Sequence, residues 1–311
     1  MIVLNREMPL RILMLQAAIR RGFPEFEEEF QNAQSGFYGE RYMDRWWEDM
    51  QLAEDHVLLH NFCFRFSEFT NQVDTIFLSR HFALVLEIKN ISGRIDIDVE
   101  RDQMIRTRET GEIEVFRNPV SQVKRHQRAL ASLIGSQLPI ERAIVFMHPK
   151  SLIGSVPREE AVFRWGGLES HIRQLFSKYT PHLTNYQLME MATSLRNYHQ
   201  LPESKLRLDA RKIICGVLCS NCRYKVKMYY IRGQFECAYC KLKSFEPMLE
   251  ALQDYRLLIS EWITNQQFRE FMGVHSQDAA ARILKKLNLE KIGSKKGSKY
   301  KIPISIEIKK E

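Results

Sequence analysis

The chain has 311 residues, of which 44% are hydrophobic and 27% are charged, so it can form two or three domains with hydrophobic cores. No run approaches the roughly 18 apolar residues that a membrane-spanning helix needs, which excludes an integral membrane protein of that type. The formal net charge is +8, and residues 276–311 hold ten Lys or Arg against four Asp or Glu. Such a local excess favours a polyanionic partner, although charge alone fits RNA, DNA or an anionic membrane.

The N-terminal region is predicted to be helical from residue 1 to about 50. Its apolar stretch from Leu10 to Ile19 is interrupted by Arg11 and Gln16 and lacks a small-residue cleavage site, which indicates an amphipathic helix and not a secretory signal. We therefore expect a cytoplasmic protein. Towards the end of this region, apolar residues recur every three or four positions and form one stripe on a helix. They are Met43, Trp46, Trp47 and Met50.

The next hundred residues change to the pattern of short strands. Runs rich in Val, Ile and Phe predict strands over 57–66, 73–78, 82–89, 95–99 and 113–116. Asn118 and Pro119 then open a helix that runs to about residue 134. A continuous apolar run at 140–147 predicts a strand buried on both faces, and two further helices are expected at 168–179 and 186–198. This order predicts an α/β fold in which helices flank a mixed central sheet, with its first three strands forming an antiparallel meander.

A carboxylate and a lysine share one face at the end of the third strand. In Glu87-Ile88-Lys89 the side chains two apart point to the same side, while Ile88 enters the core. If a three-residue turn joins Leu78 to Phe82, the second and third strands pair in antiparallel. Asp74 then lies opposite Glu87, to within about one residue. Two carboxylates and an ammonium group at one sheet edge are costly unless a cation holds the carboxylates. Oxygen ligands of this kind suit Mg²⁺ or Mn²⁺, although a solvated Asp and a surface Glu–Lys pair are the simpler alternative.

Several ordered motifs between residues 39 and 128 resemble the nuclease-related domain (NERD), a branch of the PD-(D/E)XK nuclease superfamily. They are Gly39-Glu40 on the first helix, Gln72-Val73-Asp74 on the second strand, the run from Glu87 to Gly93, and the run from Asn118 to Gln122. The resemblance covers about a third of the chain. It implies a restriction-endonuclease-like fold and metal-dependent hydrolysis of phosphodiester bonds.

The resemblance also implies roles for individual residues. Asp74 and Glu87 would bind Mg²⁺ or Mn²⁺, with the Ile88 carbonyl as a third oxygen, and Lys89 would be the catalytic lysine. Glu40 would complete or support the metal site, and Gln122 would position substrate or water. Glu40 and Gln122 are equally compatible with a helix-surface charge and a polar residue at a helix start.

Basic residues follow Gln122 on the same predicted helix. Arg125 and Arg128 share one helix face, from which both could contact phosphates beside the site. A solvated helix face is the alternative for either residue. We expect the neighbouring His126 to pack or to form a hydrogen bond and not to bind metal.

Two Cys-x-x-Cys pairs predict a zinc ribbon over residues 211–246. Cys219 and Cys222 are separated from Cys237 and Cys240 by fourteen residues, which resemble a β-hairpin with a turn at Gly233. Four thiolates around one tetrahedral Zn²⁺ form a structural and not a catalytic site. Five cationic residues in or beside the hairpin favour phosphate as a partner: Lys225, Lys227, Arg232, Lys241 and Lys243. Cys63 and Cys215 are expected to be small hydrophobic side chains.

The tail is similar to winged-helix DNA-binding domains. Thr264 caps a helix that ends at Gly273, Ser276 caps a second helix to about Leu287, and residues 289–292 and 299–302 form a two-stranded wing. The expected nucleic-acid contacts come from the second helix and from the wing. They are Arg282, Lys285, Lys286, Lys295, Lys296 and Lys299. A small helical packing module with a solvated basic surface is the alternative.

Together these features predict four parts: an N-terminal helical extension (1–36), a nuclease-related domain (37–200), a zinc ribbon (211–246) and a winged-helix-like domain (250–305). The expected protein is a metal-dependent nuclease or nucleic-acid-processing enzyme whose partner is nucleic acid, with DNA favoured over RNA. A non-catalytic DNA-binding, adaptor or regulatory protein that retains the nuclease scaffold is the alternative. Divalent metal should separate the two, because only the enzyme needs it for cleavage.

Overall fold

The computed structural model describes residues 1–52, 54–66, 69–201, 204–294 and 297–304. Its contacts divide the chain into two compact units, one formed by residues 1–9 and 32–203 and the other by residues 10–31 and 204–311. The 1–36 segment therefore contributes to both units. Among the described residues, no helix combines the length and the apolar character needed to cross a membrane.

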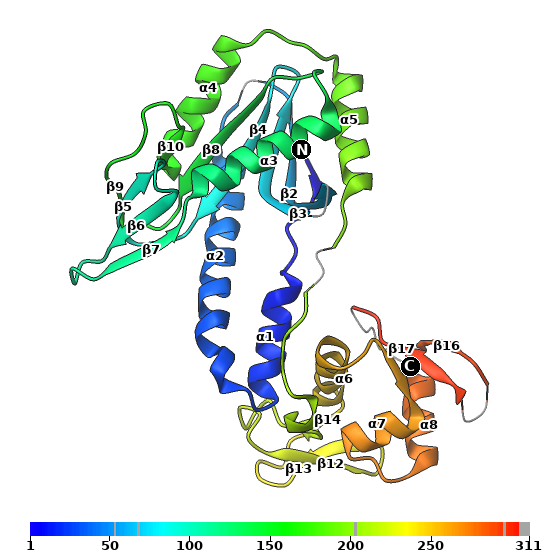
Figure 1. The fold of residues 1–311 in the computed structure, drawn as a ribbon. Coiled ribbons are helices and arrows are strands. Elements are labelled where there is room, and N and C mark those ends of the chain that lie inside the picture. Colours follow the sequence, from blue (N-terminus) through cyan, green and yellow to red (C-terminus); the bar gives the residue numbers. More distant parts are fainter. Residues whose placement is uncertain (53, 67–68, 202–203, 295–296, 305–311) are drawn as a thin grey trace. The chain divides into compact units, whose positions relative to one another are not determined.

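The first unit is built on a six-stranded mixed sheet, in the strand order β1-β2-β3-β4-β8-β10 (Figure 1). Strands β2, β3 and β4 form the predicted antiparallel meander, whereas β1, β8 and β10 pair in parallel with β2, β4 and β8. The predicted α/β class with a mixed central sheet is confirmed. The strands are β1 (Ile2–Leu4), β2 (His56–Phe66), β3 (Phe69–Ser79), β4 (Ala83–Lys89), β8 (Ile140–Phe146) and β10 (Val162–Arg164).

The prediction of helix from residue 1 was wrong at the start of the chain. Residues Ile2–Leu4 form a strand that pairs with Leu58 and Leu59 of β2. The pairing explains the difference, because a three-residue apolar run takes its conformation from the sheet edge that it joins and not from local periodicity. Helix begins only at α1 (Leu10–Arg20), directly after Pro9.

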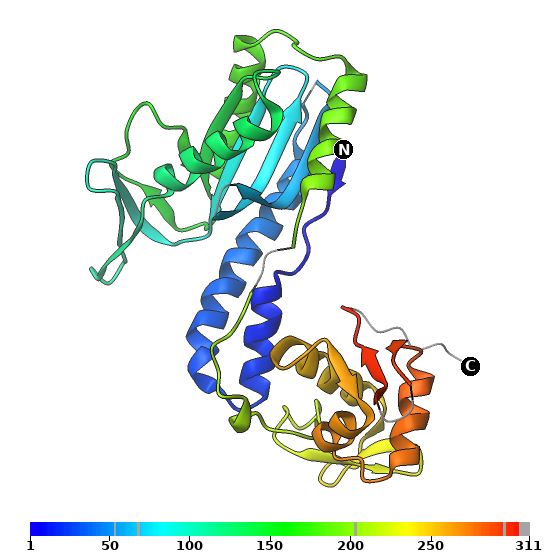
Figure 2. The ribbon, with the colours of Figure 1, turned by 45° about the vertical axis from the view of Figure 1, so that its right-hand side comes forward.

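Two pairs of helices cover the two faces of this sheet (Figure 2). Helices α2 (Glu27–Asp49) and α4 (Leu168–Lys178) pack on the face that includes Phe77, Leu84 and Leu86. Helices α3 (Pro119–Ile134) and α5 (Asn185–Tyr198) pack on the opposite face, against residues such as Val73 and Val85. The apolar stripe predicted on α2 is present, since Met43 and Trp47 are buried on it and Trp46 is partly buried, while the buried Met50 directly follows the helix.

Strands predicted near residues 95 and 113 belong to a second sheet of four strands in the order β7-β6-β5-β9, not to the central sheet. Its β6 and β9, like β10 of the central sheet, were not predicted, because short strands with mixed polarity carry little periodic signal. The second sheet packs Ile95, Ile97 and Met104 against the α3 side of the core. Its strands are β5 (Gly93–Asp98), β6 (Gln103–Thr107), β7 (Ile113–Arg117) and β9 (Ser151–Ile153).

The second unit contains α1 and a four-stranded antiparallel sheet in the order β11-β12-β13-β14. The hairpin predicted between the cysteine pairs is present as β12 and β13, which pair from Met228 and Cys237 to Ile231 and Gln234. The strands are β11 (Val217–Leu218), β12 (Lys227–Ile231), β13 (Gln234–Cys237) and β14 (Lys243–Ser244). Short 3-10 helices also occur among the described residues, namely η1 (Pro24–Phe26) and η3 (Ala210–Lys212) in this unit and η2 (Trp165–Gly167) in the first unit.

The C-terminal part of this unit follows the order helix, strand, helix, helix, hairpin. Thr264 and Ser276 cap the two central helices as predicted, and Gly273 ends the first of them in a left-handed conformation. The three strands form one antiparallel sheet in the order β15-β17-β16. The elements are α6 (Glu246–Leu258), β15 (Trp262–Thr264), α7 (Asn265–Met272), α8 (Gln277–Lys286), β16 (Glu290–Ile292) and β17 (Lys299–Lys301).

A single core joins the cysteine-bearing sheet to these helices, with Phe235 of β13 buried in the same cluster as Met248, Phe268 and Ile283. Beside it, the buried guanidinium of Arg21 donates to Asp254 Oδ2 over 2.8 Å and to the Gly216 carbonyl over 2.6 Å. A buried arginine is tolerated only when its donors are satisfied in this way. The cysteine-bearing sheet and the C-terminal helices of the second unit therefore share one hydrophobic core.

Candidate functional site

The sheet register brings Asp74 and Glu87 together at the carboxyl end of β4. Thr75 pairs with Leu86, so Asp74 and Glu87 are the next residues opposite each other on the two antiparallel strands. Both lie on the face that α3 covers, since Ile76 and Val85, two residues away from Asp74 and Glu87 along their strands, pack in that core. Glu87 is 1% exposed and Asp74 is half-buried. The Ile88 amide donates to Asp74 Oδ2 over 2.7 Å, which fixes the aspartate against β4.

Lys89 and Gln122 complete this group of polar side chains. The Lys89 ammonium donates to Glu87 Oε1 over 2.6 Å and lies 3.4 Å from Gln122 Oε1. Gln122 reaches the sheet from the first turn of α3, where the Asn118 side chain caps the helix by accepting from the Val120 amide. The predicted juxtaposition of Asp74, Glu87 and Lys89 is therefore present. We call Glu40, Asp74, Glu87 and Lys89 the acidic cluster.

One carboxylate oxygen of the acidic cluster is buried without a hydrogen bond. Glu87 Oε2 has no hydrogen-bond partner among the described residues, and His126 Nδ1 lies 3.8 Å from it. His126 is 2% exposed, and its Nδ1 also lacks a hydrogen bond. A buried unsatisfied carboxylate oxygen costs roughly 1–3 kcal/mol or more, and oxygen is the ligand atom that Mg²⁺ and Mn²⁺ prefer. The residues present thus fit a divalent cation with oxygen ligands.

The pKa values of the cluster reflect burial of several carboxylates in one place. Burial, together with the charge of Asp74, raises the pKa of Glu87 and that of Glu40 to about 8. Burial also raises the pKa of Asp74. For Lys89, the carboxylates of Glu87 and Asp74 outweigh the effect of burial, and its pKa is raised. Burial and mutual repulsion of the carboxylates therefore favour either their protonation or a divalent ion that neutralises their charge.

The Gly39-Glu40 motif has a steric explanation. A Cβ atom at position 39 would lie 2.4 Å from Asn90 Cβ, so only glycine lets α2 approach the segment after β4 this closely. The Asn90 amide also donates to the Ser35 carbonyl of α2 over 2.7 Å. This close approach brings Glu40 near enough to Asp74 and Glu87 for their charges to act on one another. Glu40 therefore lies beside the other predicted site residues, and its role there stays a prediction.

The prediction did not include Arg6, which occupies the other side of Glu40. Its side chain is 1% exposed and donates to Glu40 Oε2 over 2.5 Å and to Asp44 Oδ2 over 2.9 Å. A third nitrogen donates to Thr75 Oγ1 over 2.9 Å, beside Asp74. No local signal marks Arg6, because it reaches this position only through the unpredicted strand β1. Glu40 is therefore held by an arginine and is not a solvated helix-surface charge.

The four cysteines of the second unit converge as predicted. The Sγ atoms of Cys219 and Cys240 are 3.6 Å apart, those of Cys222 and Cys237 are 3.8 Å apart, and all four lie within 4.8 Å of one another. Four thiolates at the usual Zn–S distance of about 2.3 Å occupy tetrahedron corners about 3.8 Å apart. This set, which we call the cysteine centre, can therefore hold a tetrahedral Zn²⁺. Cys63 is buried as expected, whereas Cys215 is exposed and does not fill a core.

The predicted nucleic-acid contacts lie on the surface of both units. Arg125 and Arg128 of α3 are exposed, as are Arg282, Lys285 and Lys286 of α8 and Lys299 of β17. None of these six forms an ion pair with a described residue. Lys295 and Lys296, expected in the wing, lie outside the described residues.

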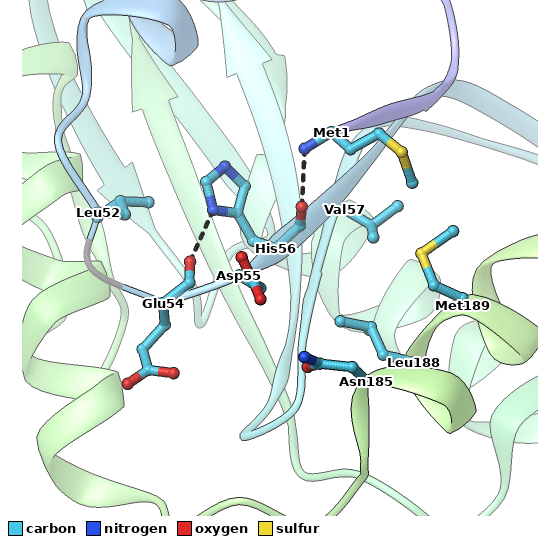
Figure 3. A pocket seen from close by; sticks show the side chains of 9 residues that line it. All are labelled: Met1, Leu52, Glu54, Asp55, His56, Val57, Asn185, Leu188 and Met189. Carbon is cyan, nitrogen blue, oxygen red and sulfur yellow. Dashed lines mark hydrogen bonds between the residues drawn. The ribbon is translucent and has the colours of Figure 1, made fainter.

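The first unit also has a cavity of about 370 Å³ that is separate from the acidic cluster (Figure 3). It lies at the start of β2, where His56 pairs with Ser79 of β3, and Glu54, Asp55 and Met189 contribute to its lining. The imidazole Nδ1 of His56 forms a hydrogen bond of 3.1 Å with the Glu54 carbonyl oxygen. No residue predicted for catalysis lines this cavity.

Comparison with protein-family models identifies the domain that holds the acidic cluster. Residues 35–147 match the family model of the nuclease-related domain, a range that includes the acidic cluster and Gln122. No curated protein matches the chain. No solved structure matches it.

Proposed function

Because the chain carries a nuclease-related domain at residues 35–147, we propose that it is a metal-dependent nuclease, with Asp74 and Glu87 as ligands of Mg²⁺ or Mn²⁺. The observation that supports this proposal most strongly is that Asp74 and Glu87 lie together on one sheet face. There Glu87 Oε2 is buried with no hydrogen bond to any described residue, and the Lys89 ammonium lies 2.6 Å from Glu87 Oε1. The Ile88 carbonyl is a candidate third oxygen ligand. Such an ion, when bound, lowers the pKa of a water molecule and stabilises negative charge on a phosphate.

The side chains around the carboxylates support distinct tasks. Lys89, held between Glu87 and Gln122, presents an ammonium group that can stabilise the charge developing on the scissile phosphate. The half-buried Gln122 can orient the attacking water or the substrate from the start of α3. Glu40, fixed by Arg6, maintains the negative potential at the site. Arg125, three residues after Gln122 on α3, can contact a neighbouring phosphate.

The second unit supplies the proposed targeting modules. The cysteine centre binds Zn²⁺ as a structural ion, and the order α6, β15, α7, α8, β16, β17 corresponds to a winged helix with α8 as its recognition helix. Both modules carry exposed cationic side chains, such as Arg232 and Arg282, that form no ion pair with a described residue, which favours a polyanionic partner. The winged-helix order of elements favours DNA as that partner.

A cleavage assay tests the catalytic proposal. The full chain should cleave labelled DNA when Mn²⁺ or Mg²⁺ is added, and Lys89→Ala and Glu87→Gln should each lower the rate roughly 100-fold or more. DNA affinity measured in Ca²⁺ should stay close to that of the parent chain, because neither change removes a surface contact. Lys150→Ala removes an exposed lysine of the same unit and should leave the rate unchanged.

Equal cleavage by the parent chain and both site variants would remove Glu87 and Lys89 from the mechanism. If the parent chain binds DNA but does not cleave it with either metal, the protein is instead a non-catalytic binding or regulatory protein on a nuclease scaffold.

A further inference from the structure

A cavity of about 510 Å³ lies within the second unit, between the turn of the β12–β13 hairpin and helix α8. Its volume is in the range of sites that hold a small organic molecule or a single nucleotide. The hairpin contributes Tyr230 and Arg232, and α8 contributes Arg282, Ile283 and Lys286, with Phe245 between them. Both elements belong to the same compact unit and share one core, so the walls of the cavity are held together.

The charged part of the lining is entirely positive. Arg232, Arg282 and Lys286 are exposed, and no acidic side chain is among the lining residues. None of the three forms an ion pair with a described residue, whereas nearby Lys243 is paired with Glu236 at 3.4 Å. Three unneutralised cations around one cavity repel one another, so an anion entering it is stabilised by all three.

The rest of the lining is aromatic. Tyr230 and Phe245 are half-buried, and each packs against Phe235 with ring centroids 5.3 Å and 6.5 Å apart. This packing fixes both rings at the cavity wall. The Lys286 ammonium lies 5.7 Å from the centre of the Phe245 ring, a cation–π contact that places charge beside the aromatic surface. Aromatic faces next to cations are the combination that proteins use for unpaired nucleotides.

The hairpin turn directs one cation to the cavity. Ile231 pairs with Gln234, so Arg232 and Gly233 form a two-residue turn, and both have positive φ angles of 47° and 92°. Such turns favour Asn or Asp followed by Gly. An arginine in the left-handed region costs stability relative to those residues, and here its side chain lines the cavity.

We propose that this cavity, the basic pocket of Tyr230, Arg232, Phe245, Arg282 and Lys286, binds an unpaired nucleotide of a nucleic-acid strand. The base stacks on the aromatic wall, and the cations contact its phosphate and the next one. This inference rests on the proposed function in taking nucleic acid as the partner, and it adds a preference for single-stranded segments. Neither the hairpin nor α8 forms the site alone.

Fluorescence anisotropy with labelled oligothymidylate and with a blunt duplex of equal length tests the pocket. The full chain is used with zinc retained and with Ca²⁺ in place of Mg²⁺, so that cleavage does not interfere. Tyr230→Leu, Arg282→Ala and Lys286→Ala should each weaken binding of the single strand roughly tenfold. Their effect on the duplex should be clearly smaller.

Matched controls lie in the same unit outside the pocket. Lys212→Ala removes the same charge from an exposed residue of the second unit, and Tyr229→Leu removes the exposed ring on the other side of β12. Both should change single-strand affinity less than twofold to threefold. Lys286→Glu, a surface change that leaves the core intact, provides a second variant if Tyr230→Leu reduces the folded fraction.

Each result has a definite meaning. If pocket and control variants weaken binding equally, or if the duplex loses as much affinity as the single strand, the pocket proposal is overturned while the proposed function stands. If the parent chain binds neither probe, the proposed function fails together with it. Selective loss of single-strand binding in the pocket variants supports the proposal, whatever the outcome of the cleavage assay.

Discussion

The acidic cluster and the cysteine centre are both candidate metal sites, and they are assembled from the chain in different ways. The cysteine centre uses four ligands of one kind from two Cys-x-x-Cys turns within residues 219–240. The acidic cluster collects Glu40 from a helix and Asp74, Glu87 and Lys89 from two strands. A full set of four thiolates suits a structural ion, whereas a few carboxylates beside a lysine leave coordination positions for water and phosphate. The type of ligand and the spacing of the ligands along the chain therefore distinguish a structural metal site from a catalytic one.

The largest expected effect comes from breaking the cysteine centre. Cys222→Ser should abolish zinc binding, which contributes on the order of 10 kcal/mol in small structural sites. The core that the ribbon shares with α6, α7 and α8 should then lose its packing. Zinc content and limited proteolysis would show this, with rapid cleavage within 204–304 and a protected first unit. Cys215→Ser, an exposed cysteine outside the centre, is the control. Full zinc content in Cys222→Ser would contradict the assignment.

A smaller effect should follow from moving α2 away from the acidic cluster. Gly39→Ala places a Cβ 2.4 Å from Asn90 Cβ and should destabilise the first unit by about 1–3 kcal/mol. It should also lower metal-dependent cleavage, because Glu40 moves with the helix. Gly36→Ala is the matched control one turn earlier on α2, where an added Cβ meets nothing within 4 Å. That change should stabilise the unit by about 0.5–1 kcal/mol. Denaturant unfolding followed by tryptophan fluorescence measures both, and similar stabilities for the two variants would refute the close-approach argument.

The smallest expected effect is a pH dependence of the first unit. The pKa values of Glu87 and Glu40 are raised to about 8 in the folded state. A raised carboxyl pKa contributes stability that is fully present below the unfolded value of about 4.5 and is lost as pH rises through about 8. Without divalent metal, the unfolding temperature should therefore fall over this window. Mn²⁺ should stabilise the unit more at the upper end, where the carboxylates are ionised.

Glu87→Gln supplies the comparison for that titration. It should flatten the metal-free pH profile and remove most of the stabilisation by Mn²⁺. If the unfolding temperature of the parent chain is constant between pH 4.5 and 8, the pKa values of these carboxylates are not raised in the folded state.

Much of this protein could be predicted from local sequence. The alternation of apolar runs gave the meander and the flanking helices, and the two Cys-x-x-Cys pairs predicted the cysteine centre, because their ligands are close in the chain. The motif from Glu87 to Lys89 placed a carboxylate and an ammonium group on one face through the two-residue repeat of a strand. The boundaries proposed at 37–200, 211–246 and 250–305 and the roles of the site residues remain predictions.

Only the tertiary structure revealed the features that depend on contacts between segments far apart in the sequence. Strand β1 exists because the edge of β2 accepts it, and only that pairing delivers Arg6 to Glu40. The steric need for Gly39 appears only when α2 lies against Asn90, and the basic pocket exists only where a ribbon turn faces α8. Local sequence determines which side chains an element presents on each face. Which faces meet depends on the free energy of packing between distant segments, and no single segment encodes it.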